Sequence, residues 1–104
     1  MRPQVITQTG TGTTAWIPVD YKQSPFAIGL GVVINSGTAT YTVEHTFDDI
    51  FDSTITPTAF PHPTVAAQTT NKDGNYAFPV RAIRLNVTAG ASPVTTLTAL
   101  QGLR

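Results

Sequence analysis

Residues 76–101, YAFPVRAIRLNVTAGASPVTTLTALQ, decide the fold of this chain. In the first half of this stretch apolar and polar residues alternate, with Ile83, Leu85 and Val87 on one side. A period of two is typical of a strand that buries one face and exposes the other. Residues 89–93, AGASP, follow with a glycine that permits positive φ and a proline that ends the strand. The stretch therefore predicts a β-hairpin.

The second strand of this hairpin has Val94, Leu97 and Ala99 as its apolar side. Because that spacing shifts by one residue at Thr95–Thr96, we predict a β-bulge there. An isolated hairpin is only marginally stable in water, so the rest of the chain must supply further strands.

Four further strands are expected upstream. Gln4–Thr9 forms one strand and Ala15–Val19 another, which we place at a sheet edge because Pro18 lacks an N–H group. Phe26–Asn35 is the most apolar run, and the alternating Thr38–Thr46 follows a short Asn-Ser-Gly turn. These last two segments predict a second hairpin.

Glycine occupies two positions inside the most apolar of these strands. Gly29 and Gly31 share one side of the strand, and glycine in a strand interior weakens it unless something approaches closely. We expect a bulky aromatic side chain, Trp16 or Tyr41, to lie over the pair.

Residues 47–63 break the alternation and predict a long connection with one short strand at 53–56. Another strand is expected at 64–70, and Asn71–Asn75 is typical of a turn. No segment has a helical 3.6-residue period, so essentially no helix is expected. The sequence thus predicts an all-β fold, an antiparallel β-sandwich of about seven strands with jelly-roll or Greek-key wiring.

The size and composition indicate one domain that associates with other chains. The 104 residues predict a single β-sandwich domain over 1–104, in which 1–5 form an extended N-terminal arm. Only 12% of residues are charged and the formal net charge is zero. Such a surface lacks the self-repulsion that keeps monomers apart, which favours a homo-oligomer, either a dimer or a trimer, over a threonine-coated monomer.

Several classes of partner are not expected. There is no basic excess of the kind that nucleic acid requires, and there is no cysteine for a disulfide or a thiolate metal site. No apolar run approaches the roughly 20 residues that span a membrane, and the first ten residues lack a signal-peptide core. We therefore expect no nucleic acid, no membrane and no cofactor.

The titratable residues give little basis for catalysis. His45 lies on the apolar side of its strand, which favours a core or interface histidine, and no metal-ligand spacing joins it to His62. The carboxylates of Asp48, Asp49 and Asp52 are expected to cap backbone N–H groups, with cation binding as the alternative. We predict no catalytic and no metal-binding residue; a hydrolase that uses His45 and Asp49 is the remaining enzyme hypothesis.

Interaction features are more evident. Aromatic and aliphatic side chains cluster in the irregular segment, where they can fill the core of the chain itself or a pocket on a neighbour. With the N-terminal arm they make up the candidate interaction surface: Met1, Arg2, Pro3, Gln4, Val5, Phe47, Ile50, Phe51 and Phe60.

Two segments, YTVEHTFDDIFDSTITPTAFPHP and NKDGNYAFPVRAIRLNVTAG, resemble a group of small virion proteins of tailed bacteriophages. The resemblance is carried by Tyr41-Thr42-Val43, by Asp48-Asp49 and by Ala82–Thr88, AIRLNVT. It implies a head decoration or cement protein with a β-sandwich or jelly-roll fold that lies on the lattice of the major capsid protein.

The leading hypothesis is a non-enzymatic virion protein that is made in the bacterial host cytoplasm and decorates the capsid surface. It would reinforce the shell by bridging neighbouring major capsid protein subunits, with many weak contacts acting together. The alternatives are a head–tail connector, a tail or fibre component, or a receptor- or glycan-binding β-module that uses exposed aromatics such as Trp16.

Overall fold

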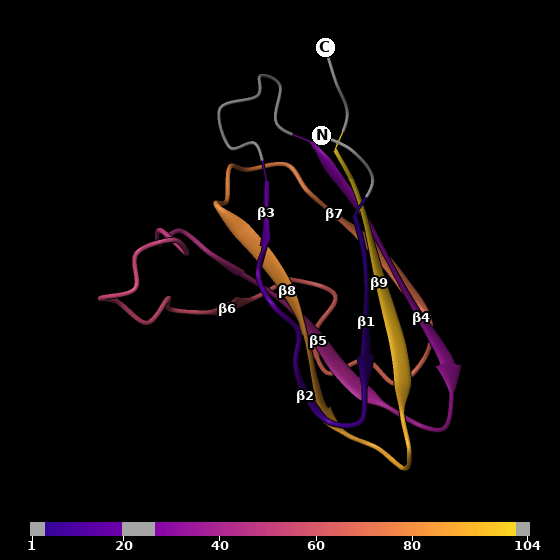
Figure 1. Ribbon diagram of the computed structural model, residues 1–104. Coiled ribbons are helices and arrows are strands. Elements are labelled where there is room, and N and C mark those ends of the chain that lie inside the picture. The colour runs from indigo at the N-terminus through magenta and orange to yellow at the C-terminus, as the bar shows by residue number, and fades with distance from the viewer. Residues whose placement is uncertain (1–3, 20–26, 102–104) are drawn as a thin grey trace.

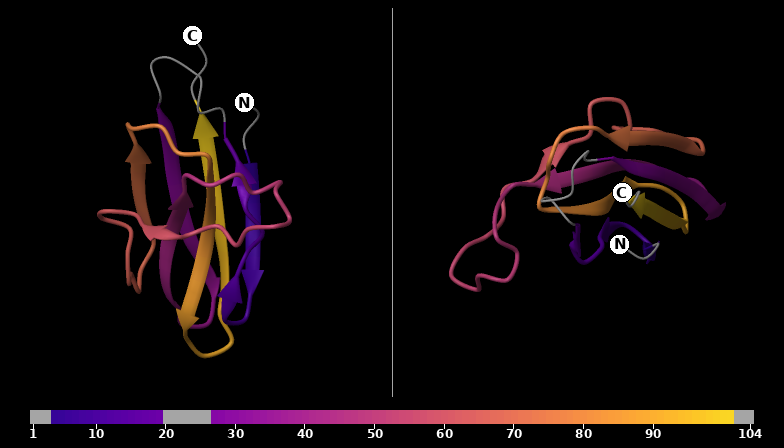
Figure 2. Two further views of the ribbon diagram at one scale, coloured as in Figure 1. Left: turned by 90° about the vertical axis from the view of Figure 1, so that its left-hand side faces the viewer. Right: turned by 90° about the horizontal axis from the view of Figure 1, so that it is seen from above.

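The computed structural model describes residues 4–19 and 27–101, and in these residues the chain forms nine strands and no helix. Two antiparallel sheets pack face to face (Figures 1 and 2). Sheet A has the order β1-β9-β4-β7, and sheet B has the order β2-β8-β5-β6 with β3 also on β8. The strands are β1 (Gln4–Thr9), β2 (Gly12–Thr13), β3 (Ile17–Pro18), β4 (Ile28–Ser36), β5 (Thr40–Thr46), β6 (Phe60–Pro61), β7 (Lys72–Tyr76), β8 (Ala82–Ala89) and β9 (Val94–Gln101).

The pairing of the strands is nested. β1 pairs with β9, β2 and β3 pair with β8, β4 pairs with β7, and β5 pairs with β6, all antiparallel. These nested pairs make the whole chain resemble one long antiparallel hairpin. Rolling up this hairpin brings β4 beside β9 and β5 beside β8, which gives the two additional pairs. With β2 and β3 counted as one interrupted strand, this is jelly-roll wiring. The all-β sandwich prediction is thus confirmed, with nine strands instead of about seven because three have only two residues.

The core lies between the two sheets and follows the alternation predicted from sequence. The side chains of Ile83, Leu85 and Val87 in β8 are buried, as expected. Ile28, Leu30 and Val32 of β4 face them from the other sheet, with Ile34 partly buried at the end of the row. The other buried members include Ile17, Val19, Ala39, Tyr41, Val43, Val65, Tyr76, Val80, Leu97 and Ala99.

Both predicted hairpins are wrong. β8 and β9 lie in different sheets, and so do β4 and β5, although each pair is joined by a short turn. A hairpin keeps its strands about 4.8 Å apart, whereas a crossover between stacked sheets spans about 10 Å. A connection of three or four residues can form a hairpin or a crossover, and the alternation in the flanking strands is the same in both cases. The sequence pattern therefore does not distinguish the two.

The short crossovers are packed together at one end of the sandwich, at the bottom of Figure 1. The N–H of Thr38 donates to the carbonyl of Ala91 at 3.2 Å, and the N–H of Ala91 donates to Oγ1 of Thr38 at 3.0 Å. The β1–β2 crossover joins them, because the N–H of Gly10 donates to the carbonyl of Pro93 at 2.8 Å. We call residues 10–11, 37–39 and 90–93 the crossover end.

Four smaller predictions, one of a bulge and three of strands, are also corrected. β9 alternates regularly with Thr95 buried, so there is no bulge at Thr95–Thr96; the irregularity lies on β4, between Ile34 and Ser36. Residues 53–56 form turns, and 64–70 contribute one bridge, Tyr41 with Gln68, instead of a strand. The strand expected at 15–19 is confirmed only for Ile17–Pro18, which pairs at a sheet edge as predicted.

The predicted turn at Asn71–Asn75 belongs largely to β7, which pairs with β4 along its length. Residue preference favours a turn here, but a long neighbouring strand supplies backbone partners that outweigh the preference. Gly74 also has a packing role, since a Cβ at this position would lie 2.8 Å from the Val65 side chain and 3.1 Å from the His62 ring.

The glycines of β4 are not covered by an aromatic ring. A Cβ on Gly31 would meet nothing within 4 Å, and one on Gly29 would meet only the Leu100 carbonyl at 3.8 Å. Tyr41 is instead buried in the core, where its hydroxyl donates to the carbonyl of Thr70 at 2.6 Å. The expectation for Trp16 or Tyr41 is therefore wrong.

Glycine at the crossover end is required by both conformation and space. Gly37 has φ of 72° and Gly90 has φ of 146°, and a Cβ on either would overlap backbone carbonyl oxygen of the facing crossover. We expect Gly37→Ala and Gly90→Ala each to lower the free energy of unfolding by about 1–3 kcal/mol, measured by urea denaturation. Gly31→Ala is the matched control, because its φ is not positive and its surroundings are open; it should raise stability by about 0.5 kcal/mol. Equal effects at all three positions would contradict this explanation.

Candidate interaction surface

Aromatic rings gather at the end of the sandwich opposite the crossover end. The His45 ring, at the end of β5, stacks on Phe60 of β6 with 5.8 Å between centroids and 22° between planes. It makes edge contacts with Phe47 at 5.4 Å, Phe78 at 5.6 Å and Tyr76 at 5.0 Å. Residues in or next to β5 and β6 of sheet B and β7 of sheet A thus form one cluster of rings.

The local sequence explains how the cluster forms. His45 and Phe47 are two residues apart, as are Tyr76 and Phe78, so each pair lies on one side of an extended segment. His45 and Tyr76 are the last inward-facing residues of β5 and β7, and both are buried. The two phenylalanines continue the same rows beyond the strand ends, where the facing sheet no longer covers them.

The outer members of the cluster form an exposed apolar surface. Phe47 is 50% exposed, Phe60 43% and Phe78 40%. Phe47 and Phe60 also contact each other, with centroids 5.7 Å apart. We call Phe47, Phe60 and Phe78 the aromatic patch. Exposed rings that adjoin one another mark interaction surfaces more often than isolated exposed residues do.

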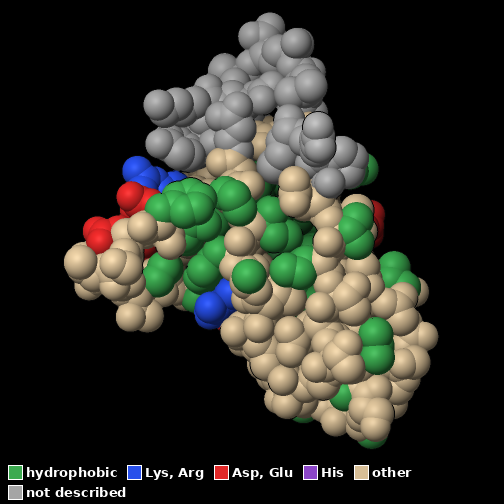
Figure 3. Space-filling view, viewed as in Figure 1, with side chains coloured by type: hydrophobic (Ala, Val, Ile, Leu, Met, Phe, Trp, Pro, Cys, Tyr) green, Lys and Arg blue, Asp and Glu red, His purple; other side chains and the backbone are tan. Residues whose placement is uncertain are grey.

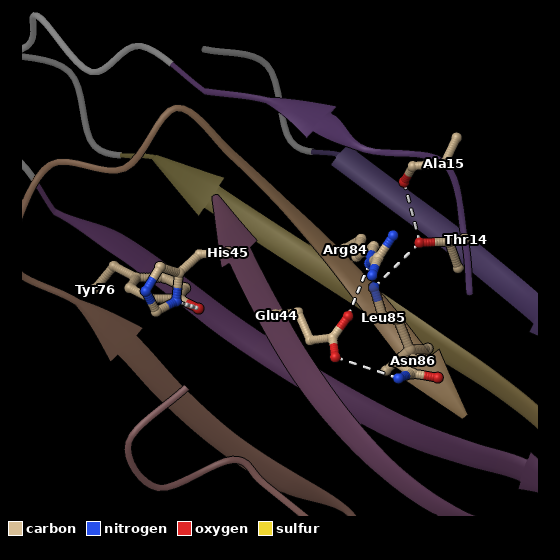
Figure 4. Close-up of polar contacts among 8 residues, drawn as sticks. All are labelled: Thr14, Ala15, Glu44, His45, Tyr76, Arg84, Leu85 and Asn86. Carbon is tan, nitrogen blue, oxygen red and sulfur yellow. Dashed lines mark hydrogen bonds and ion pairs between the residues drawn. The ribbon is translucent and has the colours of Figure 1, made fainter. Parts of the chain in front are cut away.

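Hydrogen bonds fix the polar groups beneath the patch. Nδ1 of His45 and the hydroxyl of Tyr76 are 2.8 Å apart (Figure 4). Nδ1 of His62 accepts from the N–H groups of Thr64 and Val65, both at 3.0 Å, so its Nε2 carries the proton donated to the Asn75 carbonyl at 2.7 Å. His62 therefore ties the segment after β6 to β7.

Burial shifts the pKa values of His45 and Tyr76. Burial, with a smaller effect of the neighbouring His62, lowers the pKa of His45 from its ordinary value of 6.5. Burial, reinforced by the negative charge of Glu44, raises the pKa of Tyr76, so this phenol stays protonated in the physiological range. The cluster is thus uncharged at neutral pH, which suits an apolar contact.

The long connection between β5 and β6 projects away from the sandwich (Figure 2). Its aspartates cap backbone N–H groups, as the sequence predicted: Asp48 accepts from Thr58 at 2.7 Å and Asp49 from Phe51 at 3.0 Å. Oδ1 of Asp52 accepts from the hydroxyl of Thr54 at 2.6 Å and from the N–H of Thr54 at 2.9 Å, and these two bonds lower the pKa of Asp52. The loop is therefore held in shape, with Phe51 79% exposed on it.

A cleft of about 240 Å³ lies where this loop meets β3. Arg81 and Asp49 approach to 3.9 Å at the cleft, with both side chains partly exposed. In Figure 3 hydrophobic side chains gather around the base of the loop, beside acidic and basic groups. The cleft is lined by Pro18, Val19, Asp49, Ile50, Phe51 and Arg81.

The structure divides the predicted interaction residues into groups. Phe47 and Phe60 meet in the aromatic patch, whereas Ile50 and Phe51 line the cleft. Gln4 and Val5 belong to β1 and pair with β9 instead of forming part of an arm. Met1, Arg2 and Pro3 lie outside the described residues.

Sequence reasoning missed Phe78, Tyr76 and the contact of both histidines with Tyr76. The sequence predicts a turn at Asn71–Asn75 and places Tyr76 and Phe78 after it. This prediction does not connect the two aromatic residues to a strand that begins before them. A signal was present, because an aromatic spacing of two residues recurs at His45–Phe47 and Tyr76–Phe78.

A second polar group lies on sheet B (Figure 4). Nε of Arg84 donates to Oε1 of Glu44 at 2.7 Å, and Nδ2 of Asn86 donates to Oε2 at 3.2 Å. The guanidinium carbon of Arg84 lies 4.3 Å from the centre of the Trp16 ring. Nearby, Oγ1 of Thr14 accepts from the N–H of Leu85 at 3.1 Å, which continues the ladder between β2 and β3. Both carboxylate oxygens of Glu44 and one face of the indole are therefore already occupied.

The two residues of the hydrolase hypothesis have different partners within the described part of the chain. His45 is bonded to Tyr76, while Asp49 lies on the projecting loop beside Arg81, and no hydrogen bond joins these two candidate hydrolase residues. Within the described ranges no three histidine or acidic side chains come together as a metal site. The same part of the chain contains no helix that is long and apolar enough to cross a membrane.

Comparison with protein-family models, with curated proteins and with solved structures gives no match to this chain.

The lowered pKa of His45 predicts a specific loss of stability in acid. Below about pH 6.5 the unfolded chain binds a proton at this residue more readily than the folded chain does. Stability is thus fully present above that pH and falls as the pH drops toward the folded-state pKa. We expect the free energy of unfolding of the unmodified protein, measured from pH 8 to pH 4.5, to fall more steeply than that of His45→Asn. Parallel curves for the two proteins would show that His45 does not contribute.

Proposed function

We propose that this chain is a structural virion protein of a tailed bacteriophage that decorates the capsid and reinforces it by bridging neighbouring major capsid protein subunits. The observation that carries the proposal is the aromatic patch: Phe47 and Phe60 are exposed and in contact with each other, and Phe78 is exposed beside the same His45 ring. That ring is fixed by a buried hydrogen bond to Tyr76. A rigid apolar surface of this kind suits docking into a preformed pocket on another protein, since little ordering entropy is lost on binding.

The surface composition agrees with attachment to a lattice. The formal net charge is zero and the exposed apolar side chains are spread over several elements, including Phe51 and Ile55 on the projecting loop. Each copy then needs only a modest contact, because neighbouring contacts to a repetitive shell reinforce one another through high effective concentration. In this role the protein is made in the host cytoplasm and ends on the capsid surface.

The fold is compatible with the proposal but does not select it. Jelly rolls occur in viral capsid proteins and also in lectin domains, so the wiring accommodates both the leading role and a glycan-binding one. A tail, fibre or head–tail connector component would likewise be a structural protein with this kind of fold. The choice between them depends on location and copy number.

One observation favours the glycan-binding alternative: Trp16 and the Glu44 carboxylate, an aromatic and an acid, both contact Arg84. Sugar sites combine such groups, but here Arg84 lies over the indole and occupies the carboxylate. A sugar would have to displace an ion pair whose side chains are only 23% and 15% exposed. The aromatic patch, which needs no displacement, is the better supported surface.

The proposal is tested by quantifying the chain against the major capsid protein in purified, dissociated virions by mass spectrometry. Copy numbers in a fixed, high ratio to the capsid protein are expected. A few copies per particle would support a tail or connector role instead, and absence from the particle would overturn a virion role.

The patch is tested by binding purified variants to shells that lack the protein. We expect Phe47→Ala combined with Phe60→Ala to weaken binding roughly tenfold or more, because central aromatic contacts dominate interfaces. The matched control is Val33→Ala with Leu100→Ala, which removes exposed apolar groups from sheet A and leaves the three patch residues unchanged. Urea denaturation must show that both variants fold. Equal binding by the two variants would contradict the assignment of the patch.

A further inference from the structure

The four edges of the two sheets differ in how they discourage pairing with another strand. β7 carries Lys72, Asp73 and Gly74, and β6 has only two residues, the second of which is Pro61. The edge formed by β2 and β3 is broken into two short pieces and includes Pro18. Charges, prolines and short or interrupted strands are the usual means by which proteins protect sheet edges.

β1 has none of these devices. Its six residues, QVITQT, contain no charge, no proline and no glycine, and four of them are β-branched, three in an unbroken row. It pairs with β9 in regular register from Gln4 to Thr9, and no other strand in the described ranges pairs with it. Every second residue of an edge strand directs its backbone N–H and C=O away from the sheet. An unprotected edge of this length is a template for strand addition.

We propose that β1 pairs antiparallel with β1 of a second copy of this chain, so that the two sheets A join into one continuous sheet across a twofold axis. A second copy fits this edge because the strand is uncharged and therefore does not repel itself. Antiparallel pairing of two identical strands is also isologous, so it closes at a dimer and does not propagate into fibres. The proposal is independent of the role at the capsid.

Side-chain direction restricts the register of this dimer. Gln4, Ile6 and Gln8 face inward and are partly buried, whereas Val5, Thr7 and Thr9 are exposed on the outer face. Residues opposite each other in an antiparallel pair point to the same face, so a register that keeps both cores on one side of the joined sheet sets one residue of β1 opposite itself. The two such registers that pair most of β1 set Ile6 opposite Ile6 or Thr7 opposite Thr7.

The register centred on Ile6 is the one that the packing favours. Ile6 packs against the core, so two Ile6 side chains on the axis make the cores of both copies continuous. The same register sets Val5, which is 64% exposed, opposite Thr7 of the second copy. Gln4 of one copy then lies opposite Gln8 of the other, and the side-chain amides of these two residues can hydrogen-bond each other.

Charge placement provides the first test, read out by sedimentation equilibrium over a range of concentrations. Val5→Lys with Thr7→Lys sets lysine opposite lysine at two symmetric places, so we expect at least a tenfold weaker dimer. Val5→Lys with Thr7→Glu sets opposite charges at those places and should restore the dimer. Both side chains are exposed, so the fold should persist, and circular dichroism checks this.

A control addresses association through the face of sheet A instead of its edge. Val33→Lys with Leu100→Lys adds two charges to the exposed side of sheet A without changing β1. We expect this variant to remain dimeric. Loss of the dimer here with retention in the double-lysine β1 variant would overturn the proposal, as would a monomeric unmodified protein at every concentration.

Cysteine cross-linking tests the register, because the sequence has no cysteine of its own. In the proposed register Ile6→Cys lies opposite itself, at the Cα separation of about 5 Å that a disulfide requires. Under mild oxidation Ile6→Cys should give a covalent dimer and Thr7→Cys should not. The reverse result, or failure of the lysine–glutamate pair to restore association, would overturn the register centred on Ile6.

Discussion

The structure depends on the mutual packing of the short crossovers at one end of the sandwich. Each of them carries a chain from one sheet to the other, and each is tied to a neighbour by backbone hydrogen bonds: Thr38 to Ala91 and Gly10 to Pro93. Because a Cβ on Gly37 or Gly90 would overlap the facing backbone, this close approach exists only with glycine there. The three crossovers together hold the strands that they join in alignment. These strands pair with others that are far away in the sequence. Nested pairing of this kind makes most contacts non-local, which predicts slow folding relative to helical proteins of this size.

Alternation in the sequence identified the long strands but not their neighbours. Ile83, Leu85 and Val87 are buried because they share one face, and a period of two shows this directly. Whether the next strand returns beside β8 or crosses to the other sheet depends on which backbone is available there, and that is a property of the whole fold. Residues 71–75 make the same point, since their turn-forming composition is overridden by the backbone of β4. Thr95, where the sequence predicts a bulge, lies instead in a regular strand and is fully buried, with its hydroxyl unpaired within the described ranges.

The candidate surface was predictable only in part, for a related reason. Phe47 and Phe60 stand out in an irregular segment, so the sequence marks them, and the capping role of the aspartates follows from residue type. Phe78 joins them only because β7 ends beside β5 and β6 across the sandwich, which no local pattern specifies. The hydrogen bond between His45 and Tyr76 likewise requires the two sheets to meet. Sequence thus showed which side chains are unusual, and the nested topology determined which of them meet.

The topology also places the two proposed surfaces apart. β1 is at one edge of sheet A, next to β9, while β7 is at the opposite edge and β6 is at the corresponding edge of sheet B. The aromatic patch is built from residues at and beyond the ends of β5, β6 and β7, so pairing through β1 leaves it exposed. A twofold dimer then carries two identical patches held at a fixed separation by one continuous sheet. Bridging of neighbouring subunits requires two such contacts on a rigid body, because a rigid connection between two correctly spaced contacts raises the effective concentration of the second. In the proposed role, pairing through the edge of β1 would supply the second contact that a single copy lacks, without using any residue of the patch.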